Sequence, residues 1–242
     1  HTLNPLTSNG KSWSPIWTPD GMQVLFTEKG ELVFAQNIDG VGEPELLAAF
    51  EDLYCYPASC STDSKEILIV GLDQKHQKRG RDISVIVLEE KEQPRLRPFI
   101  QRDFNQVDAV WSPDGRWVAY STDESRRSEV YVEPYPGPGP RTPISTDGGG
   151  HPVWSKDGKE LFYLSGDTVI AATIEIEPEF SVTNLEVLFE GQYHTTMFHS
   201  YDVAPDGRFL MIQDPRESTA PGINIVLNWF EELKRLVPPG KE

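Results

Sequence analysis

The chain has 242 residues, with 38 acidic against 22 basic side chains and a formal net charge of −16 at pH 7. This charge repels phosphate backbones and anionic lipid headgroups, so we expect neither nucleic acid nor a membrane surface as a partner. The apolar content of 38%, with six Trp and eleven Phe, is typical of a globular protein. No run approaches the roughly 20 apolar residues of a membrane helix, and no signal-peptide pattern opens the sequence.

A short module recurs five times: an apolar residue and Trp, then Ser-Pro-Asp-Gly, then an alternating apolar run. The copies are Ile16–Glu28, Val110–Thr122, Val153–Ser165 and Val203–Gln213, with a degraded one at Ser59–Gly71. The turn aspartates are Asp20, Asp63, Asp114, Asp157 and Asp206, at spacings of 43, 51, 43 and 49 residues. Asp-Gly between two β-rich runs predicts a hairpin, because Gly supplies the positive φ that a tight turn needs.

Each hairpin is followed by a third strand and usually by a fourth, and such a repeat has the size of one propeller blade. We therefore predict an all-β, five-bladed β-propeller of four-stranded antiparallel blades, in a single domain over residues 1–242. The predicted blades cover residues 9–50, 51–101, 102–146, 147–192 and 193–229. We expect residues 2–8 to supply a closing outer strand to the last blade, and residues 230–237 to form a short helix.

Three residues before the turn aspartates stand Trp17, Cys60, Trp111, Trp154 and Val203. Apolar side chains recurring at this position predict packing between blades, so we assign all five to the core. Cys55 and Cys60 would lie about 16 Å apart in an extended strand, too far for a disulfide, so we expect two free thiols. The basic run 73–82 is predicted to be a solvated loop.

The hairpin followed by an alternating strand resembles the repeat of TolB-like, WD-related propellers. The residues that carry this resemblance are Trp17–Gly21, Trp111–Gly115, Trp154–Gly158 and Ala204–Gly207. His151–Asp167, Leu185–Tyr193, Asp202–Ile212 and Ile223–Val237 together resemble the end of the propellers fused behind bacterial membrane-anchored Ser/Thr protein kinases. The resemblance implies a sensor or interaction domain in a periplasmic or extracytoplasmic setting. This sequence departs from the resemblance in two ways. It contains neither the kinase signature nor the membrane span, and it has five repeats where TolB has six blades. Either the ring has five blades, or an upstream blade is absent from this sequence.

The sequence lacks the local motifs of nucleophile elbows, phosphate-binding loops and paired zinc sites. In a propeller, however, each innermost strand begins at the same mouth of the central channel, so residues at matching repeat positions converge there. Six residues before the turn aspartates stand Ser14, Pro57, Asp108, His151 and Ser200. We predict a functional rim at this mouth made of His151, His194, His199, Asp108, Asp202, Ser200 and Tyr56.

The leading hypothesis is a ligand- or protein-binding domain that recognises a small molecule, peptide or protein, with Tyr56, Asp202 and Ser200 as ligand-binding residues. The alternative is a metal-assisted hydrolase of esters or phosphoesters, with His151, His199 and Asp108 as catalytic residues. In that case His151, His194, His199 and Asp108 would hold a divalent metal (Zn, Mn or Ca) in the central channel. A structural scaffold with an empty channel is the third possibility. The sequence leaves the partner, the substrate and the oligomeric state open.

Overall fold

The computed structural model describes residues 5–75, 80–88, 94–177, 179–196, 198 and 200–213. In this part of the chain all regular structure is β-strand, and no helix is long and apolar enough to cross a membrane. The first sheet contains β1 (Ser12–Trp17), β2 (Gln23–Glu28), β3 (Leu32–Asn37) and β4 (Glu45–Ala49). The second contains β5 (Leu53–Cys60), β6 (Glu66–Asp73), β7 (Asp82–Val87) and β8 (Arg95–Ile100).

The third sheet contains β9 (Gln106–Trp111), β10 (Trp117–Thr122), β11 (Glu129–Pro134) and β12 (Thr142–Pro143). The fourth contains β13 (Gly150–Trp154), β14 (Glu160–Ser165), β15 (Thr168–Glu175) and β16 (Ser181–Glu190). In the described residues the fifth sheet contains β17 (Tyr201–Val203) and β18 (Phe209–Met211). All neighbouring strands are antiparallel, as expected for propeller blades.

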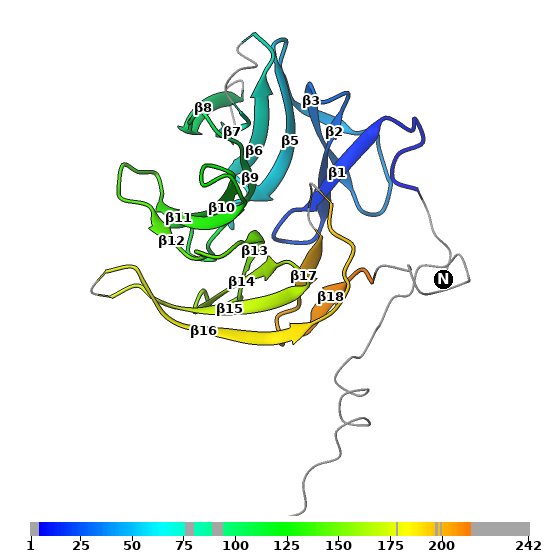
Figure 1. Ribbon diagram of the computed structural model, residues 1–242. Helices are drawn as coiled ribbons and strands as arrows, with labels where there is room; N and C mark the ends of the chain where they lie inside the picture. The colour runs from blue at the N-terminus through cyan, green and yellow to red at the C-terminus, as the bar shows by residue number, and fades with distance from the viewer. Residues whose placement is uncertain are drawn as a thin grey trace, which may run out of the picture.

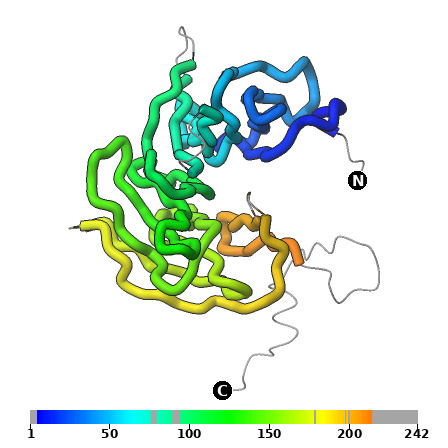
Figure 2. The backbone as a smooth tube through the Cα atoms, turned by 45° about the horizontal axis from the view of Figure 1, so that its top comes forward, coloured from blue at the N-terminus to red at the C-terminus, as the bar shows by residue number. Residues whose placement is uncertain are grey.

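The sheets follow one another around a common centre, each with its first strand innermost (Figure 1). The contacts β1–β5, β5–β9, β9–β13 and β13–β17 connect these inner strands in sequence order. A second view shows the chain passing from the first sheet, in blue, round to the orange segment that carries β17 and β18 (Figure 2). All five inner strands contribute to one cavity at this centre, and we call the region that these strands surround the central channel.

In the first four sheets, a Ser or Thr hydroxyl that donates to the turn aspartate holds the turn after the inner strand. The hydroxyl of Ser112 donates to Asp114 at 2.6 Å, and that of Ser61 donates to Asp63 at 2.7 Å. The Ser61 hydroxyl, followed by the backbone N–H of Lys65, lowers the pKa of the Asp63 carboxyl. The glycine after the aspartate has a positive φ, 70° at Gly115, so the predicted hairpin turns are confirmed.

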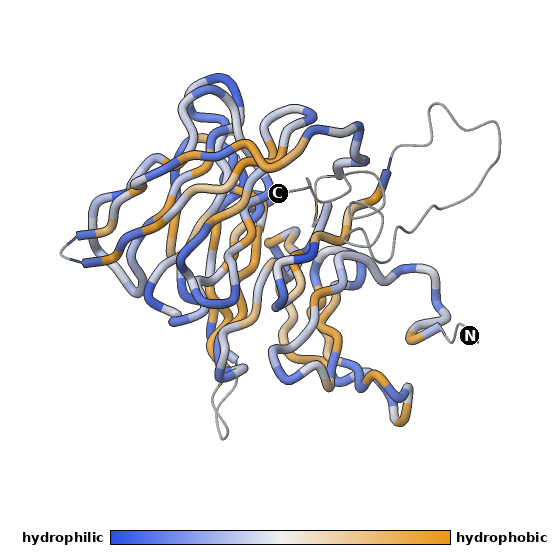
Figure 3. The backbone as a smooth tube through the Cα atoms, turned by 90° about the horizontal axis from the view of Figure 1, so that it is seen from below, coloured by the Kyte–Doolittle hydropathy of each residue, from blue (hydrophilic) through white to orange (hydrophobic). Residues whose placement is uncertain are grey.

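The second strand of a complete sheet is buried on both faces, as β6 illustrates. Ile67 and Ile69 pack toward the first sheet, in a cluster that includes residues of β1, β2 and β3. Leu68 and Val70 point the other way, into a cluster shared with the third sheet. Colouring by hydropathy shows apolar stretches concentrated in the strands and hydrophilic ones in the connections (Figure 3). The core therefore lies between successive sheets, as in a stack bent into a ring.

The core prediction is confirmed for two of the repeated tryptophans and wrong for the third. Trp111 and Trp154 are each 8% exposed, and Trp111 packs edge-to-face on Tyr135 with ring centroids 4.4 Å apart. Trp17, at the same repeat position in the first sheet, is 61% exposed. Trp111 packs in a cluster of the second and third sheets and Trp154 in one of the third and fourth, whereas none of the buried clusters among the described residues includes Trp17.

Other expectations have mixed outcomes. Cys55 is buried, Cys60 is half-buried and both are free thiols as predicted; burial raises their pKa to about 12 and about 11. Residues 5–8 belong to no strand, so this part of the predicted closing strand is wrong, and residues 1–4 lie outside the described residues. The predicted third strand of the last blade, the helix at residues 230–237 and residues 76–79 of the basic run also lie outside them.

The contrast between the tryptophans gives a direct stability prediction. We expect Trp111→Ala and Trp154→Ala each to lower the free energy of unfolding by about 3–5 kcal/mol, because each removes a buried indole. Trp17→Ala, which removes a mostly exposed ring, is expected to cost less than about 1 kcal/mol. Urea unfolding followed by circular dichroism measures all three. A loss for Trp17→Ala as large as that for Trp111→Ala would contradict the open environment of Trp17.

Candidate functional site: the central channel

The residues that the repeat brings to the channel share an unusual backbone conformation. The pairing of β9 with β10 shifts between Val107 and Val110, and β1 and β13 carry the same shift relative to their neighbours. Inside these bulges Ser14, Asp108 and His151 have φ of 52°, 56° and 55°, in the left-handed region that residues other than glycine rarely adopt. All three are six residues before their turn aspartate. A β-bulge with one fixed geometry therefore aims equivalent side chains at the channel.

Asp108 and His151 are brought together, as the sequence predicted for the two adjacent blades. The imidazole Nδ1 of His151 lies 3.6 Å from Oδ1 of Asp108, and the backbone N–H of His151 donates to Oδ2 at 3.3 Å. Their side chains are only 19% and 11% exposed. A distance of 3.6 Å is too long for a direct hydrogen bond between the two side chains, so the contact between them is electrostatic.

Tyr201 completes this part of the channel and was missed by sequence reasoning. With Asp108, His151, Ser200 and two neighbours it lines a void of about 10 Å³, which has room for a single water molecule. Nδ1 of His151 and the Tyr201 hydroxyl are both buried without a hydrogen-bond partner among the described residues. Burial, with smaller contributions from the charges of Asp108 and Asp202, raises the pKa of Tyr201, so its hydroxyl is neutral.

The repeat did contain a signal for Tyr201. Five residues before the turn aspartates stand Pro15, Ala58, Ala109, Pro152 and Tyr201, so one repeat has a large phenol where four have a small residue. The substitution fills the centre of the channel from the fifth sheet. It also supplies a polar group that the packing does not require.

One end of the channel is packed with aromatic rings. Tyr56 is buried, and Phe198 contacts it edge-to-face with ring centroids 5.2 Å apart. Phe198 also reaches Trp13 at 5.3 Å, so the segment before β17 touches both β1 and β5. Burial first, and then the charge of Asp108, raises the pKa of Tyr56. Tyr56 therefore lies near the Asp108 carboxylate as part of this aromatic plug.

The remaining predicted rim residues are spread out. The Ser200 hydroxyl is buried and holds its own loop, accepting the backbone N–H of Thr196 at 3.0 Å. His194 is exposed and its backbone N–H donates to the carbonyl of Ile212; His199 lies outside the described residues. Among the residues that the structure describes, no group of three His, Cys, Asp or Glu side chains is arranged to hold a metal ion. The four-ligand metal site thus stays a prediction, with two of its members adjacent.

The opposite end of the channel widens into a cavity of about 480 Å³, which we call the turn-side cavity. All five inner strands or their turns contribute to it: residues 15–19, 58–60, 110–113, 153–156 and 201–202, with Thr62. Its walls are mainly apolar and include the exposed ring of Trp17. Of the predicted ligand-binding residues, Asp202 lines this cavity and is exposed. Sequence reasoning placed the site at the other mouth and did not foresee this cavity.

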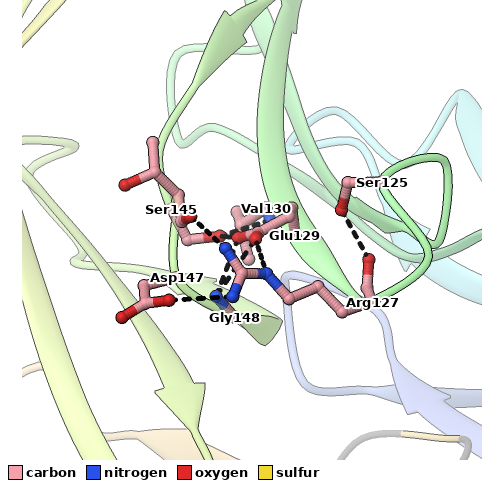
Figure 4. Close-up of polar contacts among 8 residues, drawn as sticks. Ser125, Arg127, Glu129, Val130, Ser145, Asp147 and Gly148 are labelled. Carbon is pink, nitrogen blue, oxygen red and sulfur yellow. Dashed lines mark hydrogen bonds and ion pairs between the residues drawn. The ribbon is translucent and has the colours of Figure 1, made fainter.

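A buried carboxylate fixes the glycine run that leads to His151 (Figure 4). The Glu129 side chain is 4% exposed and accepts hydrogen bonds from Nε of Arg127 at 2.6 Å, from the backbone N–H of Gly148 at 3.1 Å and from the Ser145 hydroxyl. Arg127 also pairs with Asp147 at 2.8 Å. Because these bonds tie residues 145–148 to β11, the chain enters β13 and the His151 bulge along a fixed path.

The comparisons with known proteins identify a fold. No protein-family model and no curated protein matches the chain. Among solved structures, TolB from Acinetobacter baumannii is similar with a TM-score of 0.62 and 18% identity, over 86% of this chain and 50% of that one. An oligogalacturonate lyase in complex with manganese has a TM-score of 0.65 and 12% identity, over 88% of this chain and 62% of that one. A luciferin-regenerating enzyme has a TM-score of 0.55 and 11% identity, over 84% and 68%.

These similarities establish a β-propeller fold, which confirms the predicted fold. The chain spans half the length of the TolB structure and less than two thirds of the lyase. The similar structures include enzymes as well as TolB, so the fold alone assigns no activity. The likeness to propellers of membrane-anchored kinases has no counterpart among these three structures and stays a prediction.

The Glu129 network generates a prediction about the path into His151. Glu129→Ala is expected to lower the free energy of unfolding by about 3–5 kcal/mol, because it leaves buried donors without a partner. It should also speed amide hydrogen exchange at Gly148. Asp147→Ala is the matched control: its carboxylate is 98% exposed, so its ion pair with Arg127 should contribute less than about 1 kcal/mol. Unchanged exchange at Gly148 in Glu129→Ala would show that the carboxylate does not hold this loop.

Proposed function

We propose that this chain is a binding domain, a sensor or interaction propeller, whose ligand occupies the turn-side cavity. The observation that carries the proposal is this cavity of about 480 Å³, to which every inner strand contributes. Sites for small molecules commonly have volumes of roughly 300–1,000 Å³ and apolar walls with a few polar groups. A small molecule, or the end of a peptide or protein segment, is the class of ligand that fits.

The exposure of Trp17 supports the same location. Trp111 and Trp154 occupy the matching repeat positions and are buried, so the fold does not need an exposed indole at this point. A large aromatic side chain held open to solvent on a cavity wall is a common anchor for a ligand. The packed aromatic end of the channel leaves no comparable space around Tyr56 and Phe198.

We also infer that the complete ring has five blades. Four sheets have four strands, and the fifth begins with the same inner hairpin, Tyr201–Val203 and Phe209–Met211. Phe209 and Met211 pack against the fourth sheet, while Leu210 and Ile212 are exposed on the other face. The chain continues for residues 214–242, which include the segment 223–229, a predicted strand. We infer that this part of the sequence supplies the further strands of the fifth blade.

A fragment screen followed by amide NMR tests the binding proposal. We expect bound fragments to shift the indole N–H of Trp17 and the amides of residues 110–113 and 153–156. Trp17→Ala should weaken this binding about tenfold or more, because it removes the aromatic wall. A second cavity of equal volume between the first and second sheets offers a control, since Leu96→Ala alters only that one. Fragments that bind only there, or a Trp17→Ala variant with unchanged affinity, would contradict the proposal, and a protein without hits would favour the scaffold hypothesis.

The metal-assisted hydrolase has one observation in its favour. The 3.6 Å between Nδ1 of His151 and Oδ1 of Asp108 is about the separation of two ligands that each lie about 2.1 Å from one ion. The residues present fit such an ion only in part, since they supply two strong ligands and a neutral phenol. If an ion were bound there, it would polarise a carbonyl or phosphoryl oxygen.

Metal analysis of the purified protein decides this second candidate. A stoichiometric divalent metal that is lost in Asp108→Asn or His151→Ala would support it. Protein that stays free of metal after incubation with Zn²⁺ and Mn²⁺ would rule it out. The binding proposal for the turn-side cavity does not depend on the outcome, because neither His151 nor Asp108 lines that cavity.

A further inference from the structure

The repeat supplies a reference for the residues that line the turn-side cavity, because the sheets contribute equivalent positions. All five contribute the position four residues before the turn aspartate, and the first four contribute the position one residue before it. Four residues before the turn aspartates stand Ile16, Ser59, Val110, Val153 and Asp202. One residue before them stand Pro19, Thr62, Pro113, Lys156 and Pro205. At each position four repeats have an uncharged residue and one has a charge. Both charged departures, Lys156 and Asp202, line the cavity.

Lys156 has no structural role in its turn that the structure reveals. The hairpin keeps the standard contacts, with the Ser155 hydroxyl donating to Asp157 at 2.8 Å. Proline at this position presets the turn, and lysine does not. The neighbouring cation Lys159 lies 3.9 Å from Asp157, whereas the ammonium of Lys156 has no hydrogen bond or ion pair with any described residue. Its charge is therefore available to a ligand.

Asp202 also has no oppositely charged partner among the described residues. Its carboxylate accepts the backbone N–H of Val203 at 2.8 Å and pairs with no cation in the described part of the chain. A carboxylate has about four acceptor positions, so most of its capacity remains open. The matching residues in the other inner strands are aliphatic or Ser, which shows that the strand itself does not require a charge here.

The two charges and the exposed indole come from the fourth, fifth and first sheets. β13 precedes Lys156, β17 contains Asp202 and β1 ends at Trp17, and all three residues line the same cavity. An indole face attracts cations, so Trp17 and Asp202 favour a positive group, whereas Lys156 favours a negative one. We propose that the turn-side cavity selects a small zwitterion with an apolar body, its cationic group between Asp202 and Trp17 and its anionic group on Lys156.

This inference rests on the proposed function of the cavity and names its ligand class. A ligand with one charge would pair with Asp202 or with Lys156, leave the other without a partner and lie near a like charge. A neutral apolar ligand would use neither. Only a molecule with both charges, such as an amino acid, matches both departures from the repeat.

Four related probes separate these cases in an NMR titration. They are L-phenylalanine, N-acetyl-L-phenylalanine without the cation, L-phenylalaninamide without the anion, and benzyl alcohol without either charge. We expect L-phenylalanine to bind about tenfold more tightly than each singly charged analogue, as expected for losing one charge-assisted hydrogen bond. Shifts of the Trp17 indole N–H report the site.

Two variants assign the charges, and two more serve as controls. In Lys156→Gln, L-phenylalanine and its amide should bind equally well. In Asp202→Asn, L-phenylalanine and its N-acetyl form should bind equally well. Lys159→Gln and Asp206→Asn each remove a charge from the same two turns, but neither residue lines the cavity. Both variants should therefore still bind L-phenylalanine more tightly than its two singly charged analogues.

The outcomes distinguish the zwitterion preference from the proposed binding function of the cavity. If all four probes shift Trp17 with equal affinity, the cavity binds ligands but the zwitterion preference is wrong. If a singly charged analogue binds more tightly than L-phenylalanine, the preference is also wrong and the sign of that charge identifies the true class. If none of the four, including benzyl alcohol, reaches Trp17 at millimolar concentration, both the preference and the cavity's binding function are contradicted.

Discussion

Burial of both faces of every sheet is the constraint on which this structure depends. In β6 the alternating residues Ile67 and Leu68 pack into two different clusters, one shared with the first sheet and one with the third. A sheet of this kind cannot be stable alone, because each face needs a neighbour. Stacking twisted sheets face to face bends the stack into a ring and brings the inner strands to its centre. The channel is thus a consequence of core packing.

The channel has three parts: an end packed with aromatic rings, a small void in the middle and an open end at the turns. Trp13, Tyr56 and Phe198 pack one end, and Asp108, His151 and Tyr201 enclose a void for about one water molecule in the middle. The turn end stays open, and there the side chains of Trp17, Lys156 and Asp202 are exposed. Ligand recognition can develop at this end without loss of the core. Lys156 and Asp202 are two charged residues at this end that the packing of the sheets does not require.

Much of the fold could be predicted from the repeat. The Asp-Gly turns, the burial of Trp111 and Trp154, and the meeting of Asp108 with His151 follow from spacing alone, because equivalent positions in a repeat adopt equivalent geometry. The exposure of Trp17 could not be predicted this way, since its repeat position is the same as that of the buried Trp111 and Trp154. For Tyr201 and Lys156, the signal was a departure from the repeat at positions that sequence reasoning did not compare.

The central claim is that Trp17 departs from its repeat equivalents and opens onto a ligand cavity. Incorporating fluorine-labelled tryptophan and recording fluorine NMR with a soluble paramagnetic reagent tests it most directly, with Trp17→Phe, Trp111→Phe and Trp154→Phe assigning the resonances. The account predicts strong broadening of the Trp17 resonance and little change for Trp111 and Trp154. Equal protection of all three would show that Trp17 is packed like its counterparts, and the cavity would then lose its aromatic wall.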